Sequence, residues 1–336
     1  MSRTHMVVDT ANLLFRVASA QGKYGPSGTA EEKAGLAMHV ALNTLNKYYK
    51  QFRPDEVAVT FEGAKNWRKD YTKSEHCKSG RVYKANRVKD PSMIAFFELI
   101  KSFEELARQH TSLICLSHDR LEGDDLFGGY VQKYSTQEHI ENGVKVVGIS
   151  GDRDFVQLLK HPNFTLINPD DGKPRTVDDP DFFMFEKCFR GDSGDNVMSA
   201  LPRVRKDRLI RSLSDEYEMT KLMNETWTYV DPETKAEKVH LVSDLFLENE
   251  ILMNLERQPE DIRALIIETI ERESTNHGKF SHFQFVKFCG KFGLKQIAEN
   301  AQNFADMFGT TGKKSSASSE KIEQAVPGKS PIIQMF

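Results

Sequence analysis

Residues 144–155 read VKVVGISGDRDF, an apolar run followed by two aspartates two positions apart. The run Val144–Ser150 has the length and composition of one buried strand. Because side chains alternate along a strand, Asp152 and Asp154 are expected on the same side just past its carboxyl end, where open α/β sheets bind ligands. Two carboxylates at that place repel each other unless a cation lies between them, which favours Mg²⁺ held by oxygen ligands.

The rest of the chain alternates between strand-like and helix-like patterns. Strands are predicted over His5–Asp9, Glu56–Glu62 and Ser112–Leu116, and helices over Ala30–Tyr49, Pro91–Arg108 and Asp124–Tyr134. This alternation favours an α/β fold, a parallel sheet with crossover helices. Since several of the strands end at an acidic residue, their carboxylates are expected to converge at one edge of the sheet.

Two further acidic motifs are expected at that edge. A helix that starts in Leu121–Leu126 places two acids on one face, and an acidic first turn suits the helix dipole. In Gly191–Asn196 two aspartates are again three positions apart, in a turn with glycine. The predicted metal ligands are Asp9, Glu62, Glu122, Asp124, Asp125, Asp152, Asp154, Asp192 and Asp195. Carboxylates without histidine fit Mg²⁺ or Mn²⁺ better than zinc, and this many acids could hold two ions.

Two ions about 3.5–4 Å apart can activate a water and stabilise the leaving oxygen in phosphodiester hydrolysis. This chemistry needs no nucleophilic side chain, and the sequence contains no G-x-S-x-G, H-E-x-x-H or G-x-x-x-x-G-K motif. The acidic set therefore predicts a two-metal-ion phosphodiesterase, with Asp9 and Asp152 among its catalytic residues.

The basic residues gather apart from the acidic motifs, although the net charge is −3. Residues 65–89 interleave lysines and arginines with Trp67, Tyr71 and Tyr83, and a second basic run follows Asp195. A local patch attracts phosphate over about 10 Å whatever the net charge. A solvated charged face is the plain alternative, but the neighbouring acidic motifs and aromatic residues favour nucleic acid.

The amino-acid composition limits which kinds of protein this chain can be. The 336 residues are 39% hydrophobic and 28% charged, which suits a globular α/β domain with room for a smaller lobe. No apolar stretch approaches the roughly 20 residues of a spanning helix and the amino terminus lacks a secretory core, so a cytoplasmic protein without a membrane partner is expected. The four cysteines lack metal-finger spacing and are expected to be reduced.

The ordered motifs resemble the structure-specific 5′-nucleases, the family of flap endonucleases and of the 5′→3′ exonuclease domain of DNA polymerase I. The matching segments are Val7–Arg16, Thr60–Gly63, Arg68, Tyr83–Arg87, Leu121–Asp125, Ser150–Phe155 and Gly191–Asn196. They span about two thirds of the chain and are most similar to the ribonuclease H of T-even-like bacteriophages. The resemblance implies a PIN-like parallel sheet with flanking helices, a helical arch and a helical C-terminal lobe.

The resemblance also implies an activity. The expected enzyme is a Mg²⁺-dependent 5′→3′ exonuclease, flap endonuclease or ribonuclease H that removes RNA primers and 5′ flaps in DNA replication. It would act as a monomer on branched DNA and RNA–DNA hybrids, with a single-strand DNA-binding protein as a partner, in the host cytoplasm if phage-encoded. Lys84 and Arg87, at the base of the arch, would be catalytic and hold the scissile phosphate, while Tyr83 would stack on an unpaired base. The predicted nucleic-acid-binding residues are Arg68, Lys69, Tyr83, Lys84, Arg87, Arg203, Arg205, Lys206 and Arg208.

The sequence departs from this family at two places. Glu62 stands where the family usually has aspartate. After Gly191–Asn196 the family continues with a glycine- and proline-rich turn that grips the duplex and often binds K⁺, whereas residues 197–209 lack those glycines. We therefore expect no K⁺ site and expect side chains of the second basic run to contact phosphates, with strong salt dependence.

The expected domains are a catalytic domain over residues 1–190 with a basic arch at about 65–110, a duplex-binding lobe over 191–308, and a disordered tail over 309–336. The tail ends in the apolar peptide Pro331–Phe336, in which Ile332, Ile333, Met335 and Phe336 either dock into a sliding clamp or form a frayed end without function.

Two other functions stay open. A non-catalytic member of the family could bind branched DNA as a replication adaptor, although a binder gains nothing from concentrated negative charge beside phosphates. A PIN-type single-strand ribonuclease also carries acids at strand ends, but such proteins are usually shorter and have fewer of them.

Overall fold

The computed structural model describes residues 3–16, 28–87, 93–231, 235–275 and 278–309. These residues form two compact units. The first takes its described residues from 3–65, 93–177 and 263–309, and the second from 66–87 and 178–262. The predicted clamp-binding residues Ile332, Ile333, Met335 and Phe336 lie outside the described residues, so their role stays a prediction.

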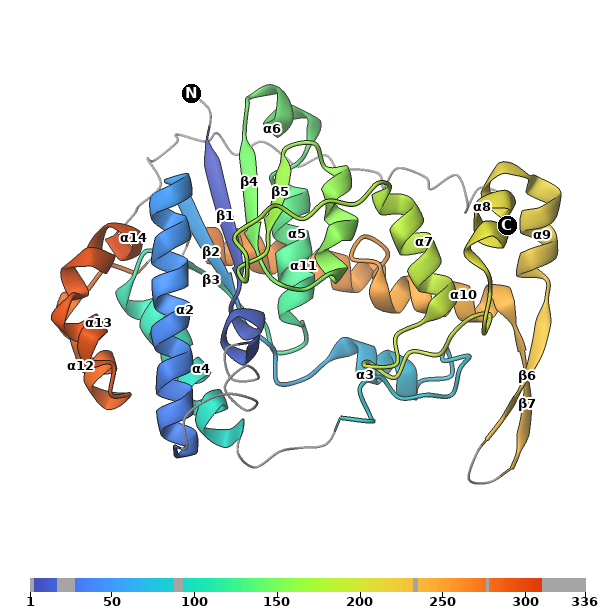
Figure 1. The fold of residues 1–336 in the computed structure, drawn as a ribbon, viewed down its shortest axis with the longest axis horizontal. Helices are drawn as coiled ribbons and strands as arrows, with labels where there is room; N and C mark the ends of the chain where they lie inside the picture. The colour runs from blue at the N-terminus through green and yellow to red at the C-terminus, as the bar shows by residue number, and fades with distance from the viewer. Residues whose placement is uncertain (1–2, 17–27, 88–92, 232–234, 276–277, 310–336) are drawn as a thin grey trace. The chain divides into compact units, whose positions relative to one another are not determined.

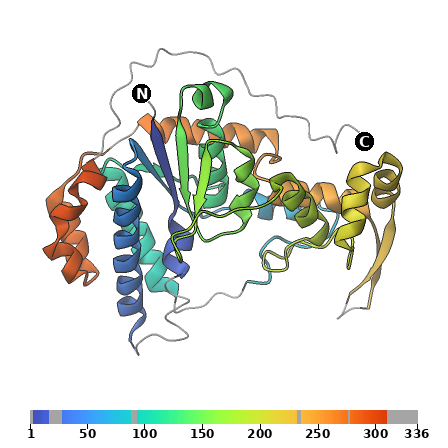
Figure 2. The ribbon, with the colours of Figure 1, turned by 45° about the horizontal axis from the view of Figure 1, so that its top comes forward.

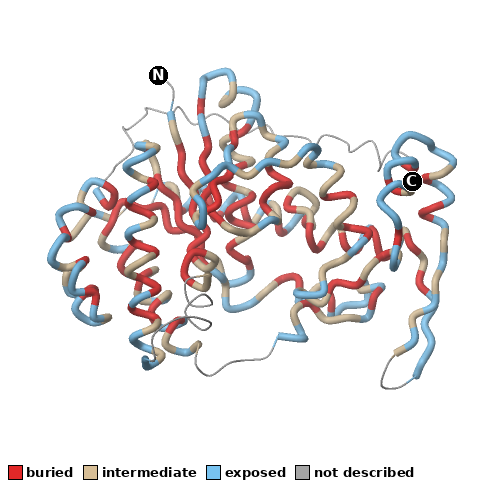
Figure 3. Tube along the Cα trace, in the orientation of Figure 1, coloured by how far each residue is buried: buried red, intermediate tan, exposed pale blue. Residues whose placement is uncertain are grey.

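A five-stranded parallel sheet forms the centre of the first unit, in the order β3-β2-β1-β4-β5 (Figure 1). The strands are β1 (Thr4–Asp9), β2 (Glu56–Thr60), β3 (Ile114–Leu116), β4 (Lys145–Ile149) and β5 (Phe164–Ile167). They are buried almost throughout, as expected for a parallel sheet that is covered on both faces (Figure 3). The strand order changes direction beside β1, which makes the carboxyl ends of β1 and β4 the topological switch point where such sheets bind ligands.

Helices cover both faces of this sheet (Figure 2). The helices of the first unit are α2 (Ala30–Phe52), α4 (Ile94–His110), α5 (Gly123–Lys133), α6 (Gln137–Glu141), η2 (Asp154–Lys160), α11 (Glu260–Thr275), α12 (His282–Lys291), α13 (Lys295–Glu299), η3 (Ala301–Phe304) and α14 (Ala305–Gly309). Helices α2, α4 and α12 share one apolar cluster with β1 and β2, which contains Leu42, Leu99 and Phe288. Helix α5 packs on β1 and β2, and Gly129 of α5 lies against Ile266 of α11.

The second unit is mostly helical around its own apolar cluster. Its elements are α3 (Trp67–Lys73), α7 (Pro180–Arg190), α8 (Lys206–Ser214), α9 (Glu216–Met223), the antiparallel strands β6 (Thr226–Val230) and β7 (Glu237–Leu241), and α10 (Val242–Met253). Phe185, Phe189, Leu209 and Phe246 lie in the core of this unit. It therefore holds a hydrophobic core separate from that of the sheet.

The structure confirms the predicted α/β class, with a parallel sheet flanked by helices. Each predicted strand is present, although β2 ends at Thr60, before the predicted end at Glu62. Strand β5 and the β6–β7 hairpin were not predicted; the hairpin lies among the helices of the predicted C-terminal lobe. Its residues 226–230 alternate between exposed and half-buried side chains, which is the pattern of a strand with one covered face.

The expected boundaries at residues 190 and 308 do not coincide with those of the compact units. Residues 263–309 pack in the first unit, where Phe285 and Phe288 join the same cluster as Phe103 of α4. The C-terminal segment packs in the first unit through apolar contacts with residues that are far away in the sequence. A domain boundary drawn at one position in the sequence cannot describe such an arrangement. None of the helices in the described ranges is long and apolar enough to cross a membrane.

Candidate active site

Asp9 is the last residue of β1 and is buried, with 5% of its surface exposed. Its Oδ1 accepts a hydrogen bond from the backbone N of Asn12 at 2.9 Å, and its Oδ2 accepts one from Ser150 Oγ at 2.9 Å. Burial, together with the nearby charge of Asp152, raises the pKa of Asp9 to about 6 despite these two hydrogen bonds. The Ser150 bond joins the carboxyl ends of the neighbouring strands β1 and β4.

The segment directly after β4 carries Asp152 and Asp154. Gly151 N donates to Asn12 Oδ1 at 2.9 Å, and Asp152 N donates to Ser150 Oγ at 3.0 Å. Asp154 N in turn donates to Asp152 Oδ1 at 2.8 Å. Asp152 therefore lies in the short loop past β4, and Asp154 begins η2 directly after it. Asn12 and Ser150 hold this segment through these hydrogen bonds, and neither was predicted as a site residue. The position of Asn12, one helical turn after Asp9, is the signal in the sequence that points to it.

Asp124, in the first turn of α5, lies within electrostatic range of four other carboxylates. Burial raises the pKa of Asp124 well above its usual value, and the charges of Glu62, Asp9, Glu122 and Asp152 raise it further. These residues come from the ends of β1, β2 and β4 and from the start of α5. The first unit therefore gathers five of the predicted acids into one negative cluster, which we call the carboxylate cluster.

Glu62 reaches the start of α5 because that helix begins at a glycine. A Cβ atom at Gly123 would lie 3.3 Å from both Glu62 Oε1 and Thr60 Oγ1. Such contacts are tighter than ordinary van der Waals contact, so any larger side chain would crowd the Glu62 carboxylate. The glycine in the Glu-Gly-Asp-Asp motif thus has a local steric reason.

Asp125 has a structural role at the same helix start. It is fully buried, and its Oδ2 accepts a hydrogen bond from Glu122 N at 3.0 Å. The Glu122 side chain accepts from the backbone N of Asp125, which completes a capping box for α5. Asp125 is thereby occupied in capping the helix, and its predicted part in metal binding stays a prediction.

The acidic loop 191–196 belongs to the second unit, where Asp195 pairs with basic residues. Asp195 Oδ2 accepts a hydrogen bond from Tyr83 Oη at 2.7 Å and lies 3.7 Å from Lys84 Nζ, while Oδ1 accepts from Arg87 Nη2 at 2.5 Å. Burial acts to raise the pKa of Asp195, but the charges of Lys84 and Arg87 and the Tyr83 hydrogen bond bring it below its usual value. The loop and the predicted arch base are thus joined through one carboxylate.

Asp192 stabilises the turn that presents Asp195. Its Oδ1 accepts hydrogen bonds from Gly194 N at 2.9 Å and Asp195 N at 3.3 Å, and its Oδ2 lies 3.4 Å from Lys187 Nζ. Both aspartates therefore have close polar partners inside the second unit, and their predicted part in the metal centre stays a prediction.

Two predicted nucleic-acid contacts do not fit their positions in the structure. Arg68 is 2% exposed, its Nε donates to Leu252 O at 2.7 Å, and its guanidinium lies over the Trp67 ring. Tyr83 is 5% exposed, with its hydroxyl bound to Asp195. A phosphate cannot reach this guanidinium and a base cannot stack on this ring, so we remove both from the candidate interface. Sequence spacing alone could not show that they are interior.

Several other basic residues predicted to contact phosphate lie at the surface of the second unit. Lys69, Arg203, Arg205 and Lys206 are exposed. Arg208 is half-buried, and its Nη1 donates to Glu225 Oε2 at 3.0 Å. With Arg87, whose side chain is exposed although it pairs with Asp195, five of the predicted phosphate contacts are accessible in this unit, while Arg208 already has a carboxylate partner.

The carboxylate cluster consists of oxygen donors, the kind of ligand that a hard divalent cation prefers. As they stand, the described residues contain no group of three or more His, Cys, Asp or Glu side chains arranged to hold an ion. The donor chemistry nevertheless fits a hard divalent cation, because a cation would relieve the repulsion that raises the pKa of Asp124.

Comparison with known protein families shows to which family the chain belongs. The family model described as 5′-3′ exonuclease, N-terminal resolvase-like domain, matches residues 4–185, more than half of the sequence. The chain belongs to this family of 5′-3′ exonucleases. The resemblance drawn from the ordered motifs is thereby confirmed, and the match covers the whole carboxylate cluster.

A phage enzyme is among the relatives of this 5′-3′ exonuclease family member. The ribonuclease H of Enterobacteria phage T4 is 28% identical over 191 residues, which are 53% of this chain and 58% of that protein. The match therefore spans less than two thirds of the relative's length.

Solved structures agree with the fold. A T5 protein co-crystallised with metal ions gives a TM-score of 0.55 at 18% identity, over 81% of this chain and 100% of that one. A bacteriophage T5 flap endonuclease variant, in a pseudo-enzyme–product complex with DNA and metal ions, gives 0.54 at 19% identity over the same shares. A mutant of the T5 5′-exonuclease gives 0.51 at 19% identity, over 81% and 99%. These similarities confirm the PIN-like α/β fold.

Proposed function

We propose that this chain is a divalent-metal-dependent 5′ nuclease that removes RNA primers and 5′ flaps during DNA replication. The observation that carries the proposal is the carboxylate cluster at the switch point of the sheet, where burial and the charges of four acids raise the pKa of the fifth, Asp124. A protein without a cation at this place would lose stability by gathering like charges. Membership of the 5′-3′ exonuclease family supports the same reaction class.

In this proposal the carboxylate cluster holds Mg²⁺, for which Mn²⁺ can substitute. The proposed ligands are Asp9, Glu62, Glu122, Asp124 and Asp152, with Asp125, Asp154, Asp192 and Asp195 as further candidates for a second ion. When bound, the ions supply activation of a water and stabilisation of the leaving oxygen. Ser150 and Asn12 orient Asp9 through both of its oxygens, so this ligand is held in place by the protein itself.

The proposed substrates are branched DNA and RNA–DNA hybrid duplexes, bound through phosphates. Lys69, Arg203, Arg205 and Lys206 offer accessible charge, and Lys84 and Arg87 are proposed to contact the scissile phosphate. The relatives support this choice, because one is a ribonuclease H and another was crystallised with DNA. Replication in a phage-infected host cytoplasm, by a monomer that also contacts a single-strand DNA-binding protein, is the proposed setting.

The test uses three 5′-labelled substrates, namely a 5′-flap duplex, an RNA–DNA hybrid and a plain single strand, each with and without Mg²⁺. We expect Mg²⁺-dependent release of short 5′ products from the flap or the hybrid. The Asp152→Asn variant should lose cleavage yet keep or gain affinity for the flap, because one negative charge near phosphate is removed. Absence of metal-dependent cleavage of all three substrates would overturn the proposal. Cleavage of the single strand alone would favour a PIN-type ribonuclease.

A further inference from the structure

The loop between β3 and α5, residues 117–122, brings Glu122 into the carboxylate cluster. On one side it lies against the segment after β2. Gly63 N donates to Leu121 O at 2.9 Å, and Lys65 N donates to Asp119 O at 2.7 Å. A Cβ atom at Gly63 would lie 2.3, 2.5 and 2.6 Å from the carbonyl oxygens of His118, Asp119 and Leu121. The two backbones are in direct contact, so the loop has no room to move in this direction.

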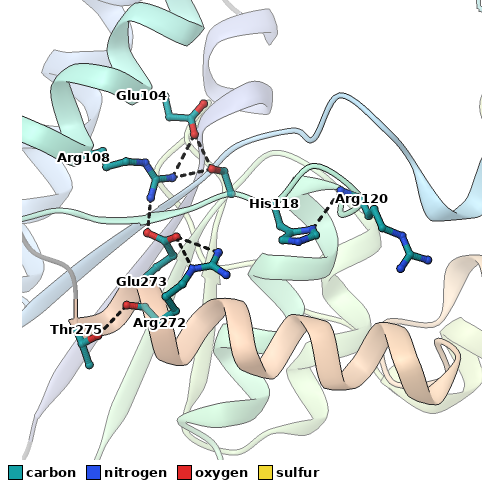
Figure 4. Close-up of polar contacts among 8 residues, drawn as sticks. Glu104, Arg108, His118, Arg120, Arg272, Glu273 and Thr275 are labelled. Atoms are coloured by element: carbon teal, nitrogen blue, oxygen red, sulfur yellow. Dashed lines mark hydrogen bonds and ion pairs between the residues drawn. The ribbon is translucent and has the colours of Figure 1, made fainter.

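On its other side the loop is held by a polar network that Figure 4 shows. Ser117 Oγ donates to Glu104 Oε1 at 2.5 Å and accepts a hydrogen bond from Arg108 Nη2 at 2.7 Å. The other terminal nitrogen of Arg108, Nη1, forms an ion pair with Oε2 of Glu273 on α11. Glu273 is 7% exposed at its side chain, and Arg272 binds its second oxygen at 3.1 Å. Arg108 therefore links α4, the loop and α11.

The loop itself is short and internally bonded. Arg120 N donates to His118 Nδ1 at 3.2 Å, and Leu121 N donates to His118 O at 3.1 Å. A shift at Ser117 would therefore carry the whole turn with it and displace Glu122 at its far end. Glu122 in turn begins the capping box of α5, on which Asp124 lies.

We propose that Arg108 is a positioning residue for the carboxylate cluster: by joining Ser117 to Glu273, it sets the place of Glu122 and Asp124. This inference rests on the proposed function of the cluster. Helix α11 lies beyond the residues 4–185 that the family model matches, so the C-terminal part of the first unit supports the acids contributed by the N-terminal part. Arg108 touches none of the reacting groups and acts through the loop.

A purely structural role for Arg108 would lower stability without changing metal affinity, so the test measures metal binding directly. Mn²⁺ binding to the full chain is followed by the electron paramagnetic resonance signal of unbound Mn²⁺, beside thermal unfolding in EDTA. Arg108→Met should weaken Mn²⁺ binding about tenfold, the scale seen when outer partners of metal ligands are removed. Cleavage should recover at high Mn²⁺, because the ligands themselves remain.

Arg272→Met is the matched control, because Arg272 binds the same Glu273 without touching the loop. It should bind Mn²⁺ like the wild type. Ser117→Ala removes the two hydrogen bonds of the Ser117 hydroxyl, to Glu104 and Arg108, but keeps the Arg108–Glu273 pair, so it decides the question if Arg108→Met does not fold. Unchanged Mn²⁺ affinity in Ser117→Ala, or an equal loss in Arg272→Met, would overturn the inference. A wild-type protein that binds no Mn²⁺ would instead overturn the proposed function.

Discussion

Asp9 and Ser150 are joined by a hydrogen bond of 2.9 Å across the neighbouring strands β1 and β4. The same Ser150 hydroxyl accepts a hydrogen bond from the backbone N of Asp152 at 3.0 Å. One small side chain therefore orients Asp9 and fixes the backbone of a second predicted ligand, at the place where the strand order of the sheet changes direction.

Metal affinity should depend on pH through Asp9. Its pKa is raised to about 6, and a metal must displace any proton that Asp9 holds. We therefore expect Mn²⁺ affinity to fall as the pH drops below about 6. Ser150→Ala removes a hydrogen bond that lowers the pKa of Asp9, so it should move this fall to higher pH. Titrations with Mn²⁺ between pH 5 and 8, followed by the electron paramagnetic resonance of unbound Mn²⁺, measure the effect. A fall in Mn²⁺ affinity centred near pH 4 would contradict the prediction.

Asp124→Asn should stabilise the metal-free protein while it impairs cleavage. The folded-state pKa of Asp124 is raised, so the ionised carboxylate weakens the fold at high pH and the penalty disappears once the group is protonated. We expect a gain of about 1–2 kcal/mol in unfolding free energy at pH 8 in EDTA, by urea titration, and a smaller gain at lower pH. Asp178→Asn, at an exposed position, is the control and should change little. Destabilisation by Asp124→Asn at pH 8 would argue against repulsion in the cluster.

Asp195→Asn should loosen the contact between residues 83–87 and the loop 191–196. The variant weakens two ion pairs and should lower the unfolding free energy by about 1–3 kcal/mol at pH 7. Because the folded-state pKa of Asp195 lies below its ordinary value of 3.8, this stabilisation is present above pH 3.8 and is lost as the pH falls through the folded-state pKa. The difference from the wild type should therefore shrink in acid. Asp207→Asn, which breaks the exposed pair with Arg211, should cost less than about 0.5 kcal/mol.

Gly63→Ala should damage both the fold and the site. Its Cβ atom would meet three backbone oxygens within 2.6 Å, and backbone cannot turn aside as a side chain can. We expect a loss of about 1–3 kcal/mol and weaker Mn²⁺ binding, since the loop that carries Glu122 must shift. Gly290→Ala in α12 offers the matched change, because nothing lies within 4 Å of its Cβ position. It should be neutral or stabilising by up to about 1 kcal/mol. Equal behaviour of the two variants would show that the contact at Gly63 does not matter.

Deletion of residues 331–336 should leave cleavage of a flap substrate intact. If the terminal peptide docks into a sliding clamp, stimulation by the clamp should disappear in the truncated protein. The comparison of cleavage rates with and without clamp decides between docking and a functionless end. Stimulation that survives the deletion would remove the docking hypothesis.

Local pattern in the sequence was enough for much of the fold. Apolar runs of strand length, each followed by an acid, predicted β1, β2 and β4, and their parallel arrangement followed from the helices between them. The convergence of Asp9, Glu122 and Asp152 was also predictable, because parallel strands place their carboxyl ends at one edge. The order of the motifs identified the family.

Only the tertiary structure decided which polar residues are interior and which partners they have. Arg68 and Tyr83 read as surface residues of a basic run, yet both are buried, and Asp195 binds Lys84 and Arg87. The linear pattern determines which neighbours a residue has within a strand or a helical turn. Burial and ion pairing depend instead on segments that are far apart in the sequence, so they are settled only when the chain packs.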